Sequence, residues 1–318
     1  MREFSSGLAS DIRSMIAFRQ SLGITTYEGI LSLLDRFCCE HYPGDNALTR
    51  NMALDWLADE RERHKSVRDN AIAIRQLGKY IVSENRSAYI LPNSFVSSKS
   101  DFVPHIFTDE ELHNLFTVVD SLKYFYKNPF AHIIAPVLFR LLYTCGLRPN
   151  EGRELKRENI DLKSGEILVV HNKQKKERIV VMSNDMLELC NEYEKQRRVF
   201  AENSHYFFPA CNDLPYTAIQ MTMLFRRCWK KANAKLGIEN CPQARPYDLR
   251  HRFASAIIQQ WIEEGRDLYA MLPYLRAYMG HKYFSSTAYY IHLLPENILK
   301  TSGIDWDEFE KLIPEVAK

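Results

Sequence analysis

Four side chains on separate segments together have the chemistry needed to break a phosphodiester bond. They are Arg148, Arg250, His281 and Tyr290, in this order along the chain. A guanidinium group has a planar fork of donors that matches phosphate, and it stays charged at any relevant pH. A tyrosine hydroxyl can attack phosphorus and hold the product as an ester. The set therefore predicts phosphoryl transfer through a covalent tyrosine ester.

Each of these residues taken alone has a more ordinary interpretation. An arginine that follows a glycine most often forms a surface ion pair, and His281 could be a structural histidine with satisfied hydrogen bonds. Tyr289 and Tyr290 could be core aromatics at helical spacing. The joint occurrence of all four in one order, with helices and a small sheet between them, favours a catalytic site.

The elements that would position this site are mainly helices. Thr108, followed by two glutamates, has the composition of a helix start. An apolar stretch over residues 129–145 predicts a buried helix that Gly146 ends, and Pro149 can begin the next helix. Arg148 therefore lies at a helix junction, where a side chain can point into a cleft.

A β-hairpin interrupts the helical pattern. Residues 167–170 and 179–182 are rich in β-branched side chains, and a lysine-rich turn over residues 172–176 joins them. Beyond the hairpin the pattern is helical to the end of the chain. The predicted fold class is mainly α, with a small antiparallel sheet.

The N-terminal part predicts a separate helical domain. Helices are expected over residues 27–41, from Thr49 to Glu60, and after a cap at Ser66. A stretch that contains two prolines and four serines then has the composition of an extended linker. The predicted organisation is a helical domain over residues 1–90, a linker over 91–104 and a second domain over 105–318.

Composition limits the class of protein. A length of 318 residues favours about two domains, and a hydrophobic content of 46% is sufficient for ordinary cores. The net charge of +2 does not by itself indicate nucleic acid, so local clusters must carry that argument. Seven cysteines without CxxC spacing predict free thiols in a reducing compartment and no zinc site. No signal peptide or membrane-spanning run is recognisable, so we expect a cytoplasmic protein with no membrane partner.

Three segments resemble the sequence boxes of the tyrosine recombinases, also called phage-type integrases. Residues 141–161, which contain the motif at 144–151, are similar to that family's first box, residues 247–255 to its second and residues 279–281 to its third. The resemblance is strong over about residues 105–295. It is weaker over the N-terminal helices, which look like the family's core-binding domain.

The resemblance implies a role for each site residue. The arginines would bind the scissile phosphate, the acidic residue of the first box would support them, the histidine of the third box would add a hydrogen bond, and a tyrosine counted on from it would be the nucleophile. These residues are Arg148 and Arg250, Glu151, His281 and Tyr290. The chemistry needs no metal ion and no nucleotide cofactor, because the tyrosine ester keeps the bond energy for rejoining.

The general acid implied by the resemblance lies in the hairpin turn. The first lysine of that turn protonates the leaving oxygen in the family, which indicates Lys173. Lys175 or Lys176 would take this role if the register of the hairpin differs.

The second box departs from the family pattern at its first position. The family usually has histidine there, and this chain has Tyr247. A neutral imidazole accepts a proton near pH 7, whereas a phenol with a pKa of about 10 does not. Tyr247 could still hydrogen-bond to phosphate or to the nucleophile. His251 follows Arg250 directly, and one residue along a helix turns about 100°, so we do not expect it to take the base role.

Two basic clusters are candidates for DNA contact. A helix expected over residues 216–236 interleaves cations with apolar residues, as in a helix that tracks phosphates. A helix in the N-terminal domain has a similar stripe, for which a solvated face is the more ordinary interpretation. The candidates are Arg226, Arg227, Lys230 and Lys231 in the first cluster and Arg68, Arg75 and Lys79 in the second.

The predicted function is a site-specific DNA recombinase that works through a 3′-phosphotyrosyl intermediate. The alternatives are a DNA-binding protein of the same fold that has lost cleavage and a type IB-like topoisomerase. The partners implied by the resemblance are double-stranded DNA, a homotetramer on paired sites and an accessory directionality factor. The sequence alone favours equally that a short apolar helix expected over residues 306–313 packs on its own domain or on a neighbouring subunit, and the resemblance favours the neighbour.

Overall fold

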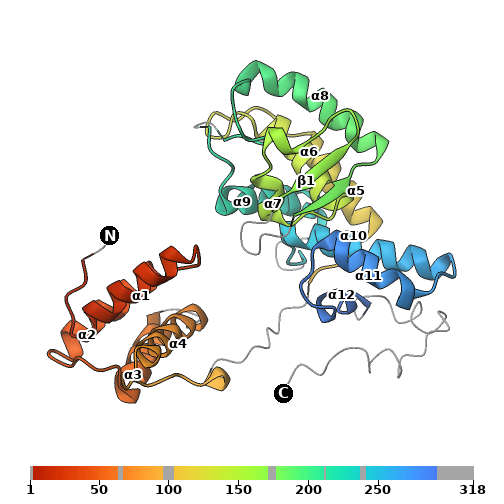
Figure 1. Cartoon of the computed structure of the whole chain (residues 1–318). Coiled ribbons are helices and arrows are strands. Elements are labelled where there is room, and N and C mark those ends of the chain that lie inside the picture. Colours follow the sequence, from red (N-terminus) through yellow and green to blue (C-terminus); the bar gives the residue numbers. More distant parts are fainter. Residues whose placement is uncertain are drawn as a thin grey trace. The chain divides into compact units, whose positions relative to one another are not determined.

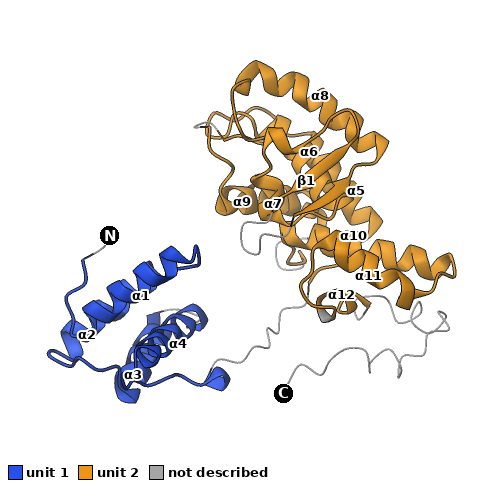
Figure 2. Ribbon diagram, viewed as in Figure 1, with its two compact units in different colours: residues 1–102 blue, residues 103–318 orange. Residues whose placement is uncertain are grey.

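The computed structural model describes residues 3–63, 67–95, 104–170, 177–210, 213–236 and 241–291. The chain divides into two compact units, residues 1–102 and residues 103–318 (Figure 2). Each unit has its own buried apolar core. The site residues of the sequence boxes all lie in the second unit.

The described residues of the first unit form four α-helices (Figure 1). They are α1 (Ala9–Ser21), α2 (Glu28–His41), α3 (Arg50–Arg63) and α4 (Arg68–Ser83). Their apolar faces enclose Trp56, which is fully buried. The expected cap at Thr49 is confirmed, because its hydroxyl oxygen accepts a hydrogen bond from the Met52 amide at 3.2 Å. The expected cap at Ser66 lies outside the described residues.

The start of the predicted linker packs on the first unit. Leu91 is buried in its core, and a 3₁₀ turn over Asn93–Phe95 follows. Arg75 of α4 donates hydrogen bonds to the carbonyl oxygens of Leu91 and Pro92, at 2.7 and 2.8 Å. The remainder of the stretch, residues 96–103, lies outside the described residues.

Where the structure describes it, the second unit is mainly helical with a two-stranded antiparallel sheet, as the sequence predicts (Figure 1). Its helices are α5 (Asp109–Asp120), α6 (Ala131–Thr144), α7 (Pro149–Arg153), α8 (Asn184–Ala201), α9 (Ala218–Ala232), α10 (Pro246–Glu263), α11 (Leu268–Met279) and α12 (Ser285–Ala288). Short 3₁₀ turns cover Arg157–Asn159 and Ala234–Leu236. The strands are β1 (Glu166–Val169) and β2 (Arg178–Val181).

The apolar stretch that begins at Phe130 forms the central helix of this unit. Helix α6 contacts α5, α8 and α10, so its side chains are buried nearly all round. Such a helix reads as apolar on every side rather than on one stripe. The start of α5 is also as expected, because Thr108 and Glu111 form a reciprocal capping box.

The sheet has one buried and one exposed face. Ile167 pairs with Val180 in the antiparallel register, and both are buried. Their neighbours Leu168 and Ile179 point to the exposed face. Both strands begin and end one residue earlier than predicted. The hairpin tip, residues 171–176, lies outside the described residues, and with it Lys173, Lys175 and Lys176.

A third core joins the last helices of the described chain. Ile258 of α10 and Leu272 of α11 pack there with Tyr290. The predicted tail helix over residues 306–313 lies outside the described residues. Among the residues that the structure describes, no helix is long and apolar enough to cross a membrane. Within the same residues, no three His, Cys, Asp or Glu side chains are grouped to hold a metal ion.

Candidate active site

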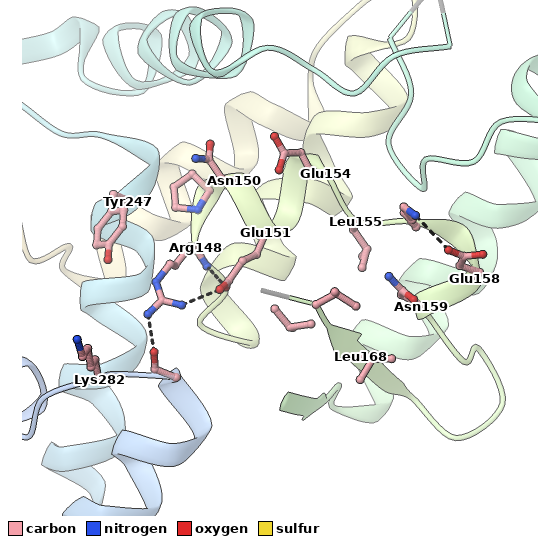
Figure 3. Close-up of a pocket in the computed structure, with 15 residues that line it drawn as sticks. Arg148, Asn150, Glu151, Glu154, Leu155, Glu158, Asn159, Leu168, Tyr247 and Lys282 are labelled. Atoms are coloured by element: carbon pink, nitrogen blue, oxygen red, sulfur yellow. Dashed lines mark hydrogen bonds and ion pairs between the residues drawn. The ribbon is translucent and has the colours of Figure 1, made fainter. Parts of the chain in front are cut away.

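The first box forms the expected helix junction. Gly146 follows the end of α6 with φ of 59°, and Pro149 occupies the first position of α7. Arg148 is the N-cap residue of α7, and its amide donates to Glu151 Oε2 at 2.8 Å. Its Nη1 donates to Glu151 Oε1 at 2.7 Å. The start of α7 therefore places Arg148 and Glu151 as a pair at the edge of a hollow (Figure 3).

Two glycine carbonyls connect the boxes: the arginine of the first box donates to the glycine of the third, and the arginine of the second box donates to the glycine of the first. Arg148 Nη2 donates to the carbonyl oxygen of Gly280 at 2.7 Å, and Arg250 Nη1 donates to that of Gly146 at 2.5 Å. Both glycines follow a helix end and have positive φ, 59° and 63°. A Cβ at Gly146 would lie 2.5 Å from Phe253 Cδ1. Backbone conformation and close packing thus both require glycine at position 146.

Glu151 is the centre of a charge network. Arg178, the first residue of β2, donates from Nη1 and Nη2 to its carboxylate at 3.0 and 2.8 Å. Burial alone would raise the pKa of Glu151, but the hydrogen bonds and charges of Arg178 and Arg148 outweigh it and lower this pKa to about 2. Arg178 Nε also donates to the carbonyl oxygen of Tyr278 at 2.7 Å. Arg178 thereby connects the hairpin to the first and third boxes.

This network predicts a pH-dependent contribution to stability. The pKa of Glu151 in the folded protein lies below the ordinary value of 4.5, so its contribution is present above pH 4.5 and is lost as the pH falls toward 2. The difference corresponds to on the order of 3 kcal/mol. Urea unfolding of wild type and Glu151→Gln should therefore differ most near pH 7, and the difference should shrink below pH 4.

The matched control is Glu158→Gln. Glu158 is an exposed carboxylate whose surface pair with Lys156, at 3.3 Å, contributes little to stability. Its substitution should leave the unfolding midpoint almost unchanged over the whole pH range. A gap between wild type and Glu151→Gln that stayed constant down to pH 3 would contradict the assignment.

Arg250 and His281 are joined directly. Arg250 is fully buried, and its Nη2 lies 3.0 Å from His281 Nε2. Because a guanidinium group only donates, Nε2 accepts this bond, so Nδ1 carries the proton and donates to Thr287 Oγ1 at 2.8 Å. Burial, followed by the charges of three nearby arginines, lowers the pKa of His281 to about 3. The imidazole is therefore neutral at neutral pH.

Tyr290 lies against this pair. It is 2% exposed, and its ring stacks on that of His281 with centroids 5.8 Å apart. Burial raises the pKa of the phenol, and Arg250 lowers it in part. Tyr289, in contrast, is 41% exposed. The structure thus brings Tyr290 rather than Tyr289 to the buried arginine.

The second box places two rings one helical turn apart. Tyr247 lines the same hollow as Arg148 and Lys282 (Figure 3), and its ring centroid lies 5.1 Å from that of His251. The expectation that the helix turns His251 away from the site is wrong, because its ring lies 5.4 Å from the ring of Tyr290. Tyr290 packs over the side of α10 that carries both residues. The orientation of His251 therefore depends on a tertiary contact that helical periodicity does not contain.

The basic candidates of α9 do not share one face. Arg226 lines a hollow with Tyr247 and His251. Arg227 and Lys231 line a different one, where the Arg227 guanidinium lies 5.5 Å from the Phe125 ring centroid. Lys230 is exposed. Arg226 therefore shares a hollow with two residues of the second box.

In the first unit the three candidate cations also differ. Arg68 and Lys79 are exposed on α4. Arg75 is half-buried and uses its Nε and Nη2 on backbone carbonyls. These two bonds give Arg75 a structural role that the sequence pattern does not indicate.

Two residues of the site carry no role in the sequence analysis. Arg178 belongs to the hairpin segment, and its side chain is only 9% exposed. The sequence feature that could have indicated it is a charged residue at the start of a β-rich run. Lys282 directly follows His281 and lines the hollow with Arg148. A cation beside the third box is a signal that sequence inspection could have found.

Comparison with known proteins places these features in one family. Residues 106–297 match the sequence model of the phage integrase family. The protein y4rE of Sinorhizobium fredii is 28% identical over 300 residues, which cover 92% of this chain and 93% of that protein. Tyrosine recombinase XerC of Bacillus pumilus is 25% identical over 307 residues, which cover 93% of this chain and 88% of XerC.

Solved structures share the fold at lower identity. The Tn1549 transposon integrase in complex with transposon right end DNA has a TM-score of 0.66 at 18% identity, over 97% of this chain and 99% of that one. The XerH site-specific recombinase bound to palindromic difH substrate, a post-cleavage complex, has a TM-score of 0.62 at 20% identity, over 91% and 82%. The fold predicted from the sequence is confirmed by these likenesses.

Proposed function

This chain belongs to the phage integrase family of site-specific DNA recombinases, and we propose that it cleaves and rejoins DNA through a 3′-phosphotyrosyl ester on Tyr290. The observation that carries this proposal is the convergence of the three boxes. Arg148, Arg250 and His281 come from three separate segments. The arginines donate to backbone carbonyls, Arg250 also donates to His281, and the His281 ring stacks on Tyr290.

The proposed reaction is an in-line displacement at phosphorus. The Tyr290 oxygen forms a bond to phosphorus, the bond to the DNA 5′-oxygen breaks, and Lys173 gives that oxygen a proton. Arg148 and Arg250 neutralise the charge that develops on the non-bridging oxygens. Attack by the 5′-hydroxyl of another strand reverses the same step and joins the new partner.

The fixed position of the arginines supports this mechanism. Donors that are ordered before the substrate arrives stabilise a transition state without a cost of reorganisation at that moment. Arg148 keeps an ion pair with Glu151, and that carboxylate is itself held by Arg178. The role of Glu151 is therefore to orient Arg148 rather than to touch DNA.

We propose double-stranded DNA as the partner of both units. In the second unit Arg226, Arg227, Lys230 and Lys231 are the proposed contacts. In the first unit, as a core-binding domain over residues 1–90, they are the exposed Arg68 and Lys79, because Arg75 is held by backbone carbonyls. The Tn1549 integrase structure holds transposon right end DNA and the XerH structure holds its difH substrate, which supports this choice. A homotetramer on paired sites, an accessory directionality factor and a cytoplasmic location are further parts of the proposal.

A nicked suicide substrate tests the proposed function. DNA from the flanks of the chain's own gene, nicked next to the cleavage position, should trap a covalent protein–DNA adduct that survives denaturation. The trapping occurs because the short cleaved strand diffuses away and cannot be rejoined. Tight binding of this DNA without any adduct would instead support the alternative that Tyr247 suggests, a DNA-binding protein that has lost cleavage.

A further inference from the structure

The proposed mechanism leaves one proton without a destination. The Tyr290 phenol is buried, and burial raises its pKa, so the hydroxyl is protonated at neutral pH and must lose its proton as it attacks. Tyr247 stands where the family has a histidine, and a phenol is a poor proton acceptor. His281 is not free for this purpose, because both of its ring nitrogens are engaged, Nε2 by Arg250 and Nδ1 by Thr287.

His251 has a nitrogen available. Its Nδ1 is buried and has no hydrogen-bond partner among the residues that the structure describes. Its Nε2 lies 4.0 Å from Asp248 Oδ1. A buried ring nitrogen without a partner costs free energy, so its retention calls for an explanation.

The surroundings of His251 suit proton transfer from Tyr290. Its ring centroid lies 5.4 Å from that of Tyr290 and 5.1 Å from that of Tyr247. Because Tyr247 and His251 are four residues apart on α10, they occupy one face of the helix. Both also line the hollow that contains Arg226.

The charged groups that face His251 have opposite effects on it. Burial has the largest effect on its pKa, Asp248 raises it, Arg245 and Arg250 lower it, and the result is about 4. The imidazole is therefore neutral at neutral pH, but the same lowering makes it a weaker base than a free histidine. Asp248 is fully buried, and the Arg245 amide and Nη2 hold its carboxylate at 2.8 and 3.1 Å. This fixed negative charge stabilises the imidazolium that forms when a proton arrives.

We propose that His251, backed by Asp248, accepts the Tyr290 proton in this chain and so replaces the histidine that is missing at position 247. The proposal rests on the proposed function. In the forward step the Tyr290 O–H bond breaks, the proton goes to His251 Nδ1, the Tyr290 oxygen bonds to phosphorus, and the 5′-oxygen leaves with a proton from Lys173. In rejoining, His251 returns its proton to the tyrosine oxygen.

Cleavage rates on the suicide substrate test the role of the ring nitrogen. His251→Phe keeps a ring in the same place and His251→Gln keeps hydrogen-bonding atoms, but neither accepts a proton, so both should form adduct about a hundredfold more slowly than wild type. DNA affinity and the midpoint of urea unfolding should stay close to wild type for at least the Gln variant. The matched control is His132→Phe in α6, another histidine whose buried Nδ1 has no partner among the described residues, and it should react at the wild-type rate.

Three further measurements separate proton acceptance from packing. The double variant Tyr247→His/His251→Phe should recover activity, because it restores the acceptor one turn away. Added imidazole should accelerate His251→Ala in proportion to its neutral fraction as the pH is varied. A 5′-bridging sulfur, which leaves without a proton, should rescue Lys173→Ala but not His251→Phe.

These experiments distinguish a failure of the His251 proposal from a failure of the proposed function. If wild type forms no adduct, the proposed function fails and His251 is not at issue. If wild type is active and His251→Gln reacts at the wild-type rate, the role of His251 as proton acceptor is overturned. Rescue of His251→Phe by the sulfur substrate would also overturn it, because the residue would then act on the leaving group.

Discussion

Replacement of Tyr290 by phenylalanine should abolish the covalent adduct completely while DNA binding stays within about twofold of wild type. The variant loses the oxygen that bonds to phosphorus, and no other group can form the same ester. It keeps the ring that stacks on His281 and fills the third core, so the fold should be retained. Adduct formation on the suicide substrate and an electrophoretic binding assay measure the two effects.

Tyr289→Phe is the matched control for this prediction. Tyr289 is the preceding residue, it is 41% exposed, and its ring lies 6.4 Å from that of Tyr290. Its variant should form adduct at close to the wild-type rate. An adduct that persists in Tyr290→Phe and disappears in Tyr289→Phe would reverse the assignment of the nucleophile.

Arg148→Ala should slow cleavage by about a hundredfold or more and weaken DNA binding only modestly. Loss of one preorganised charged donor costs on the order of 3 kcal/mol in the barrier, whereas many other phosphate contacts supply affinity. Arg148→Ala should disturb the folded state less than Arg250→Ala, because Arg148 is partly exposed and Arg250 is fully buried. Arg250→Ala would also leave the buried carbonyls of Gly146 and Met279 without a donor.

Single-turnover cleavage under saturating protein measures this loss apart from binding. Arg198→Ala serves as control, because Arg198 is an exposed arginine of α8 that pairs with Glu194 rather than with a site residue. It should cleave like wild type. Wild-type cleavage by Arg148→Ala would contradict the interpretation of the first box.

Local sequence chemistry predicts much of the scaffold and one part of the site. The apolar stretch before Gly146 and the proline after Arg148 place the α6–α7 junction correctly, because glycine and proline act on the backbone conformation of their immediate neighbours. The same holds for the caps at Thr49 and Thr108. Such features depend on residues within about one helical turn.

The parts that could not be predicted depend on contacts between distant segments. Arg178 binds Glu151 across 27 positions, and nothing in the local pattern of β2 indicates that partner. His251 faces the site only because Tyr290 packs over its side of α10. Arg75 has the spacing of a surface cation, but the path of the chain at Leu91 gives it carbonyl acceptors.

The crossed bonds from the two arginines to glycine carbonyls have a consequence for genetics. A carbonyl oxygen belongs to the main chain, so a scan that truncates side chains one by one removes neither Gly146 O nor Gly280 O. A damaging change at either glycine would act by moving the main chain, and no new side chain nearby could supply an oxygen in the same place. Second-site suppressors of such changes should therefore be rare, and these two positions should be among the least tolerant in a saturation library selected for recombination.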